Sequence, residues 1–410
     1  MRIPEPHFEI ATAPSGLRLI ALHRPGAAMG IAGIDVHVGS RDDDPGHHGL
    51  AHFVEHTIFK GTRRRSSWHI INRMEAVGGE LGAFTTKEET VVYSLFPGGS
   101  PARAAELVAD LAANSQFPAA QLDREREVVA DEIDSYLDTP SDAVYDDFDD
   151  LLFAGSPLGH NILGNREALA RFDSDICRRY LARWYVPANM VAFYAGPMRP
   201  DRAIAILERT LSAALPAGAA PARPSGIAAA PHFERDRSIG SHQSHTVAGA
   251  RIPGLGDPRR HTIGLLTNIL GGPGMNSLLN VELRERRGLV YNVEASTVMY
   301  TDTGAFTVYY GCDPDDEPRC RRLVTDTVAR VADGYLTPRR LDLARKQYLG
   351  QMVVGSENTE SRITAMARSL LLTGRIATPR DTAAALAAIT PADIASAAAA
   401  LLPLSRLTLR

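Results

Sequence analysis

GLAHFVEH, at residues 49–56, is the stretch on which the interpretation of this chain depends. Its apolar residues recur at helical spacing, and on a helix His52 and His56 lie one turn apart, away from that apolar face. Imidazoles at positions i and i+4 can reach the same metal ion, and Glu55 stands beside them. The alternative is a chance pair on a solvated helix, since the chain contains 13 histidines. The pattern predicts a helix with one face in a core and one face that binds a metal.

A third ligand is expected from another element, because a catalytic zinc site usually takes three protein ligands. Residues 119–137 have a helical pattern in which Glu125 and Glu132 share one stripe. Glu132 borders the apolar face, where a carboxylate without a partner is strongly disfavoured. The residues alone leave two interpretations of Glu132 open, a metal ligand or part of an ordinary charged helix.

The chain has 410 residues, which is enough for two or three domains. A Pro- and Ala-rich segment without apolar periodicity, residues 215–235, predicts a linker between a domain at 1–214 and a domain at 236–410. Helix, helix, glycine stop and Thr/Tyr/Val strands recur in this order in both halves, which indicates an ancient duplication. Among these elements we expect a strand at 84–96 and an amphipathic helix at 278–287. We predict an α+β fold of two related domains, each a mostly antiparallel sheet with helices packed on one face.

Composition excludes several classes of function. A formal net charge of −4 gives no electrostatic reason to bind nucleic acid or an anionic membrane. The sequence contains no uncharged apolar stretch of about 18 residues or more, so no membrane span is expected, and MRIPEP at the start lacks the apolar core of a secretory signal. Three scattered cysteines, Cys177, Cys312 and Cys320, argue against a disulfide scaffold or a zinc ribbon. They are typical of a reducing compartment, and we expect a cytoplasmic protein.

H-x-x-E-H is the inverted zinc motif of the inverzincin peptidases. With it, the chain resembles the insulinase/pitrilysin family, which includes the mitochondrial processing peptidase and many small bacterial zinc peptidases. The third ligand of that family is a glutamate some 75 residues after the second histidine, and 75 residues separate His56 from Glu132. A second acid of the family, seven residues earlier, corresponds to Glu125. The resemblance implies one zinc ion per chain, bound by His52, His56 and Glu132, although mixed N/O ligands also suit manganese or cobalt.

Three further segments carry the resemblance. WYVPANM at 184–190 resembles the family's segment near the end of the first half, and LRERRGLVY at 283–291 resembles its Arg-x6-Tyr element, with Arg284 and Tyr291. GGELGAFT at 78–85, followed by Glu88, Thr90 and Tyr93, resembles its substrate-binding edge strand. The substrate-binding residues that this implies are Glu80, Leu81, Gly82, Ala83, Phe84 and Thr85.

The resemblance also implies a function, a zinc-dependent endopeptidase that acts on short or unfolded peptides enclosed between the two domains. Glu55 would act as general base and then general acid, and Glu125 would orient the site. Tyr291 would donate a hydrogen bond to the oxyanion and Arg284 would hold the substrate, so the second domain completes the site. Without the resemblance, these last two residues are ordinary parts of a helix and a strand. Small members of the family pair two chains, which implies a homodimer, or a heterodimer with a related chain.

One position departs from the family pattern, because the family usually has Asn where this chain has Gly82. An asparagine there would add a hydrogen bond to bound peptide, so Gly82→Asn is expected to lower KM. Three other functions compete with a peptidase. The intact metal-binding residues argue against a non-catalytic subunit, and the peptide-binding strand argues against a hydrolase of esters or lactones. A structural zinc protein would need a fourth ligand, which is not evident in the sequence.

Overall fold

The computed structural model describes residues 5–98, 101–223, 227 and 231–410, which form two compact units. Unit 1 comprises the residues up to Ile133, Asn161–Pro224 and Gly355–Thr378. Unit 2 comprises Asp134–His160, Ser225–Val354 and Pro379–Arg410. Each unit therefore includes a segment from the opposite half of the sequence. Positions 224–226 and 228–230 of the expected linker lie outside the described residues.

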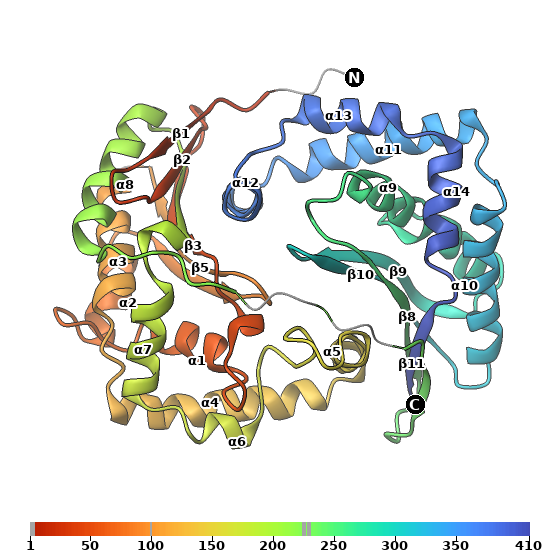
Figure 1. Cartoon of the computed structure of the whole chain (residues 1–410), viewed down its shortest axis with the longest axis horizontal. Coiled ribbons are helices and arrows are strands. Elements are labelled where there is room, and N and C mark those ends of the chain that lie inside the picture. Colours follow the sequence, from red (N-terminus) through yellow and green to blue (C-terminus); the bar gives the residue numbers. More distant parts are fainter. Residues whose placement is uncertain (1–4, 99–100, 224–226, 228–230) are drawn as a thin grey trace. The chain divides into compact units, whose positions relative to one another are not determined.

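Unit 1 is built on a six-stranded sheet (Figure 1). Every neighbouring pair of strands is antiparallel except β2 and β6, which are parallel. The strand order is β1 (Phe8–Thr12), β2 (Arg18–His23), β6 (Met190–Gly196), β3 (Met29–Val36), β5 (Thr90–Pro97) and β4 (Glu80–Thr85). The predicted edge strand β4 thus lies at one end of the sheet.

Alternation along the strands of unit 1 creates two apolar faces. Ile34 and Val36 of β3 face a core formed with most of the helices, and Ile31 faces a second core on the opposite side. The helices of the first core are α1 (Leu50–Thr57), α2 (Ser67–Glu75), α3 (Pro101–Asn114), α4 (Ala119–Leu137), α6 (Arg166–Leu169), α7 (Ser174–Trp184) and α8 (Pro200–Ala214). The opposite face is covered by α12 (Thr359–Thr373), whose Ile363 and Leu370 pack in the second core. Most helices therefore lie on one face, as expected, and one helix from the C-terminal half covers the other.

Unit 2 repeats this plan with five strands. The order is β7 (Glu234–Arg237), β11 (Ser405–Leu409), β8 (Ser244–Pro253), β10 (Thr303–Cys312) and β9 (Val290–Met299), and only β7 and β11 are parallel. The helices of its main core are α9 (Arg260–Gly271), α10 (Glu317–Ala332), α11 (Pro338–Gly355), α13 (Pro379–Ala388) and α14 (Pro391–Ala400). The other face is covered by α5 (Pro140–Leu152), from the N-terminal half. Two sheets of such similar plan, each with one parallel pair, support an internal duplication.

Some local expectations need correction. Residues 84–96, expected as one strand, form the end of β4 and most of β5. The turn between them is closed by a hydrogen bond of 2.8 Å from the N–H of Thr86 to the carbonyl of Glu89, and its residues Lys87, Glu88 and Glu89 are buried. The amphipathic helix expected at 278–287 contains the π-helical turn η3 (Asn280–Glu285), in which the N–H of Arg286 bonds to the carbonyl of Val281. The described residues also contain two short 3-10 turns, η1 (Ser40–Asp42) and η2 (Pro187–Asn189).

The search for membrane-spanning helices covers the described residues. None of their single helices combines the length and apolarity needed to cross a membrane, and one bent pair, α13 and α14, meets the criteria of length and composition together.

Candidate metal centre

Helix α1 carries the H-x-x-E-H motif, and its first turn is held from outside the helix. Gly49 precedes it with φ of 97°, a conformation that favours glycine, and a Cβ there would lie 2.6 Å from the carbonyl oxygen of Leu163. Asp43 accepts hydrogen bonds from the N–H groups of Gly49 and Ala51, at 2.8 and 3.0 Å. Because first-turn N–H groups have no partner within the helix, this carboxylate fixes where α1 begins.

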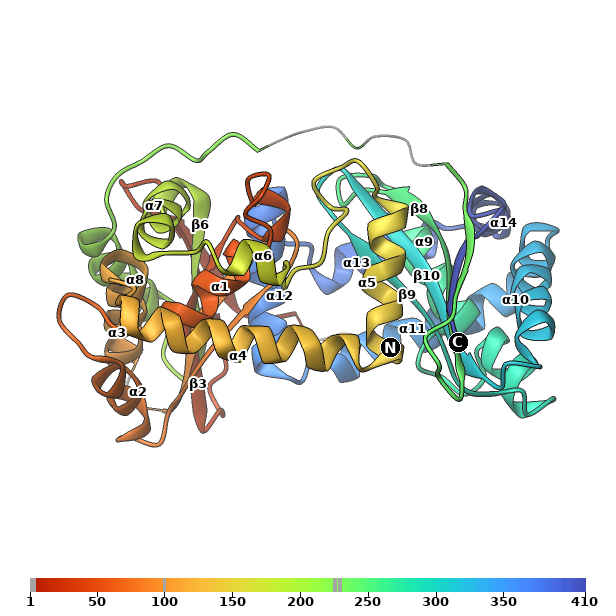
Figure 2. The same cartoon turned by 90° about the horizontal axis from the view of Figure 1, so that it is seen from below.

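His52, His56 and Glu132 each offer one ligand atom, and these atoms lie within 4.8 Å of one another. Glu132 Oε2 lies 3.8 Å from His52 Nε2 and 3.4 Å from His56 Nε2. Atoms bound tetrahedrally to zinc at about 2.0–2.1 Å are separated by about 3.4 Å, so this group fits a zinc ion. Helices α1 and α4, which supply the three residues, lie side by side (Figure 2).

Hydrogen bonds and burial prepare both histidines to bind a cation. Burial, followed by the charge of His56, lowers the pKa of His52 to about 3, so its imidazole is neutral at pH 7. His56 Nδ1 lies 3.1 Å from Glu125 Oε1, and Lys60 Nζ lies 2.6 Å from Glu125 Oε2. A carboxylate at Nδ1 favours the tautomer with its proton there, which leaves the Nε2 lone pair of His56 facing Glu132.

Glu55 lies next to these ligand atoms and is not one of the three. Burial raises the pKa of Glu55, and the negative charge of Glu132 raises it further. The charge of His56 and a hydrogen bond with Thr85 act in the opposite direction. Thr85 is the last residue of β4, so its side chain connects the predicted base with the predicted substrate strand. The charge of Glu55 also acts on Tyr185, because it raises the pKa of the phenol after the larger effect of burial.

Gly82 lies on β4 directly opposite Tyr93 of β5. Its φ is not in the left-handed region, so the backbone itself would accept another residue. A Cβ at this position would nevertheless lie 2.5 Å from Cζ of Tyr93. The expected contact of an asparagine with peptide therefore requires the Tyr93 ring to move first, because the ring occupies the space of the new side chain.

Comparison with known proteins identifies the family. Residues 18–166 match insulinase (peptidase family M16), and residues 171–348 match the peptidase M16 inactive domain. The chain belongs to peptidase family M16. It is 34% identical over 371 residues to an uncharacterized zinc protease of Mycobacterium tuberculosis, covering 89% of this chain and 84% of that protein. It is 30% identical over 367 residues to one of Bacillus subtilis, covering 89% and 88%.

Solved structures show the same fold. A peptidase M16 inactive domain from Pseudomonas fluorescens matches with a TM-score of 0.91 at 19% identity, covering 98% of this chain and 97% of that chain. A protease from Helicobacter pylori matches with a TM-score of 0.89 at 18% identity, covering 99% and 100%. Membership of the M16 family makes this chain a metallopeptidase, with zinc as its metal, and confirms the resemblance inferred from the sequence.

Arg284 and Tyr291 both belong to unit 2 of this M16 chain, in η3 and at the start of β9. Both are exposed, and the Tyr291 side chain has 65% of its surface accessible. Their contribution to the metal centre of unit 1 stays a prediction.

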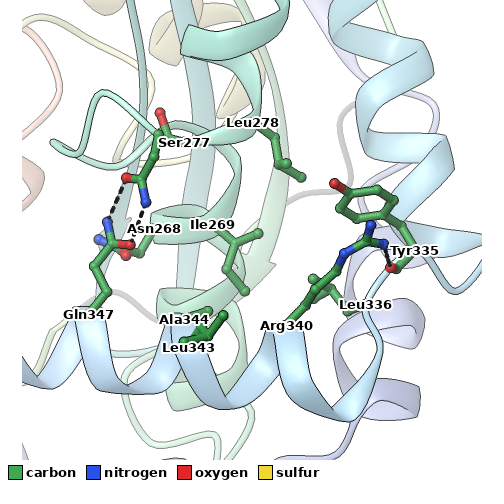
Figure 3. Close-up of a pocket in the computed structure, with 11 residues that line it drawn as sticks. Asn268, Ile269, Ser277, Leu278, Tyr335, Leu336, Arg340, Leu343, Ala344 and Gln347 are labelled. Atoms are coloured by element: carbon green, nitrogen blue, oxygen red, sulfur yellow. Dashed lines mark hydrogen bonds between the residues drawn. The ribbon is translucent and has the colours of Figure 1, made fainter.

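Unit 2 also contains a cavity of about 230 Å³ (Figure 3). Asn276 and Gln347 close one wall with reciprocal hydrogen bonds of 2.9 and 3.0 Å. At the other end Arg340 stacks on Tyr335 at 4.2 Å. Its lining contains none of the residues predicted to act in catalysis.

Sequence reasoning missed the residues that support the metal-binding side chains. Lys60 follows α1 by three residues, and its contact with Glu125 of α4 has no signal in the local sequence. Asp43 lies in an acidic run that resembles a solvated loop, and its burial against α1 is visible only in three dimensions.

Proposed function

We propose that this chain is a zinc-dependent endopeptidase that hydrolyses peptide bonds in short or unfolded peptides enclosed between its two domains. The observation that carries the proposal is the grouping of two histidine nitrogens and one glutamate oxygen within 4.8 Å, with Glu55 beside them. Zinc bound there would supply a Lewis acid for the carbonyl and a water of lowered pKa. His52, His56 and Glu132 would hold the ion.

The remaining residues of the site have roles that follow from their contacts. Glu55 accepts a proton from the attacking water and delivers it to the leaving nitrogen. Thr85 fixes the orientation of this carboxylate through their hydrogen bond. Glu125, held by Lys60, keeps the proton of His56 on Nδ1.

Substrate would bind by strand addition along β4, at the end of the unit 1 sheet. An edge strand offers unpaired backbone groups to an extended peptide, and Glu80–Thr85 would provide them. From unit 2, Tyr291 would donate to the oxyanion and Arg284 would hold the peptide backbone. The exposure of both side chains supports these roles.

We further propose that the enzyme acts in the cytoplasm as a homodimer, with a heterodimer with a related chain as the alternative assembly. All three cysteines are free and buried, which agrees with a reducing compartment. Sedimentation of the purified chain, alone and with a related chain, tests the assembly.

Glu55→Gln tests the mechanism most directly. The variant keeps all three ligand atoms, so zinc content should stay at one ion per chain. Peptide turnover should fall at least about a hundred-fold, which is the low end for loss of general acid–base catalysis. Glu127→Gln, on the exposed side of α4, is the matched control and should keep full turnover.

Zinc content and turnover are measured on the same sample, with a quenched peptide and an ester compared in parallel. Near-normal turnover of Glu55→Gln would remove Glu55 as the base. Loss of zinc would instead make Glu55 a ligand. Cleavage of the ester without cleavage of any peptide would refute the endopeptidase assignment.

A further inference from the structure

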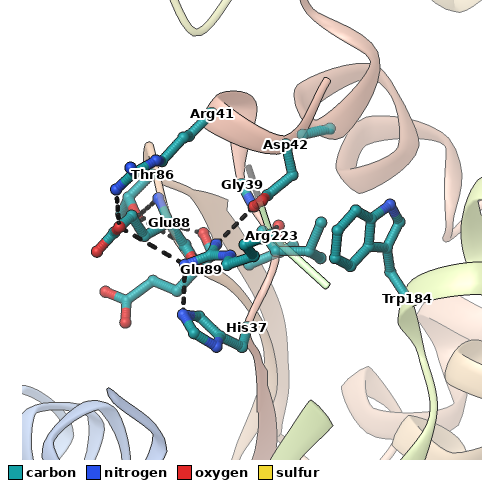
Figure 4. Close-up of polar contacts among 12 residues, drawn as sticks. His37, Gly39, Arg41, Asp42, Thr86, Glu88, Glu89, Trp184 and Arg223 are labelled. Carbon is teal, nitrogen blue, oxygen red and sulfur yellow. Dashed lines mark hydrogen bonds and ion pairs between the residues drawn. The ribbon is translucent and has the colours of Figure 1, made fainter. Parts of the chain in front are cut away.

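Arg223 lies in the predicted linker, and its guanidinium is inserted among buried groups of unit 1 (Figure 4). Its Nη2 donates to Asp42 Oδ2 at 2.5 Å and to the carbonyl of Glu88 at 2.8 Å. Its Nη1 donates to His37 Nε2 and lies 3.6 Å from Glu88 Oε1. The exposed fractions of the Arg223, Asp42 and Glu88 side chains are 14%, 0% and 1%, so this is an internal contact.

His37, Asp42 and Glu88 together form a socket for a guanidinium group. Burial, followed by the charge of Arg223, lowers the pKa of His37 to about 3, so its imidazole is neutral and can accept a hydrogen bond. Arg41 also pairs with this socket, at 2.6 Å from the same oxygen, Glu88 Oε1. A planar fork of N–H donors matches these acceptors better than a lysine ammonium, which is a single point of charge.

The socket touches the two segments that border the metal centre. Asp42 is followed by Asp43, the carboxylate that holds the first turn of α1. Glu88 lies in the turn after β4, the strand that ends at Thr85. The backbones of the two segments pack so closely that there is no room for a side chain at Gly39, where a Cβ would lie 2.3 Å from the carbonyl oxygen of Thr86.

Backbone hydrogen bonds complete the connection. The N–H groups of Ser40 and Arg41 bond to the carbonyls of Thr86 and Lys87 at 3.0 and 2.9 Å. A change at the socket is therefore transmitted to the loop before α1 and to the turn after β4 together.

We propose that Arg223 is a positioning residue for the metal centre, which it supports by holding the loop before α1 against the turn after β4. This inference rests on the proposed metal site. Without the guanidinium, Asp42 and Glu88 lose the cation that they share, while both remain buried. The loop that contains Asp43 should then move, and with it the positions of His52 and Glu55 relative to Glu132.

The test compares Arg223→Ala and Arg223→Lys with the parent chain. Zinc affinity is measured by competition with a chelator, and metal geometry by the visible absorption of the Co²⁺-substituted protein. Arg223→Ala should bind zinc at least about ten-fold more weakly, the low end for outer partners of a metal site, and should show altered Co²⁺ bands. Arg223→Lys should recover part of the affinity, and millimolar methylguanidinium should restore part of it to Arg223→Ala.

Two control variants separate positioning from general stability. Leu211→Ala removes a buried side chain of α8 in the same core, so it should lower the melting temperature and leave zinc affinity unchanged. Arg209→Ala, exposed on α8, should change neither quantity.

The inference is overturned if Arg223→Ala keeps parental zinc affinity and Co²⁺ bands, or if Leu211→Ala weakens zinc binding as much. Should Arg223→Ala not fold, parental values for Arg223→Lys in the same two measurements would overturn it. A parent chain that binds no zinc would refute the proposed function as well, so the two failures are distinguishable.

Discussion

Gly82→Asn introduces a side chain where the ring of Tyr93 already lies. The new Cβ would be 2.5 Å from Cζ and 2.7 Å from the hydroxyl of Tyr93, so the ring must move. Tyr93 also hydrogen-bonds to Glu360 of α12, and burial together with this bond raises its pKa to about 12. Moving the ring therefore breaks a contact between the sheet and α12.

The expected destabilisation combines two effects. Overpacking typically costs about 1–3 kcal/mol, and loss of one partly exposed hydrogen bond about 1 kcal/mol. Since a ring at the sheet surface can relax, we expect a total of about 2 kcal/mol. For a unit of some 200 residues this corresponds to a melting temperature roughly 4–8 °C lower. KM for a peptide should not fall below the parental value.

A double-mutant cycle with Tyr93→Ala isolates the clash. Once the ring is removed, Gly82→Asn should cost at least about 1 kcal/mol less than it does in the parent. In the Tyr93→Ala background Gly82→Asn should also lower KM, because the contact of the new amide with peptide is then possible. The assays are thermal unfolding and peptide kinetics on all four proteins. Additive stability effects, within about 0.5 kcal/mol, would show that Tyr93 does not oppose the substitution.

Three further predictions concern the metal centre, unit 2 and pH. Glu125→Gln should weaken zinc binding about 10- to 100-fold, measured by chelator competition, because His56 loses its carboxylate partner. If Glu132→Gln retains zinc while Glu125→Gln loses it completely, Glu125 is the ligand and Glu132 is not. Tyr291→Phe should lower kcat roughly 10- to 1,000-fold at unchanged zinc content, because the proposed hydrogen bond to the oxyanion is lost. Normal turnover would show that Tyr291 is an ordinary strand residue without a catalytic role. Asp35 is fully buried, and burial followed by the charge of Glu89 raises its pKa well above 3.8, against the cations Arg368 and Arg18. The folded chain then keeps a proton that the unfolded chain releases, so the contribution of Asp35 to stability is fully present below pH 3.8 and is lost as pH rises through the folded pKa. Asp35→Asn should flatten the dependence of melting temperature on pH above pH 3.8, and an unchanged slope would contradict this reasoning.

Local patterns in the sequence were sufficient to predict the α+β class, the mostly antiparallel sheets and most helices. The faces of α1 could be assigned because a helix places every third or fourth residue on one side, whatever lies around it. Resemblance to the M16 family was needed to choose between Glu125 and Glu132, since both lie on one stripe of α4. The structure gives them different neighbours, with Glu132 near two histidine Nε2 atoms and Glu125 between Lys60 and His56 Nδ1.

Other features depend on contacts between residues distant in sequence, which no local pattern contains. The sheet face opposite the main core is covered by a single helix in each unit, α12 in unit 1 and α5 in unit 2, and each comes from the opposite half of the chain. Their apolar residues predicted helices but did not indicate which sheet each would cover. Arg223 lies in a segment with the composition of a linker, and only folding brings it to Asp42, 181 positions earlier. By itself, the sequence determined which residues could do chemistry; the tertiary structure decided which of them meet, because burial and charge pairing act through space and not along the chain.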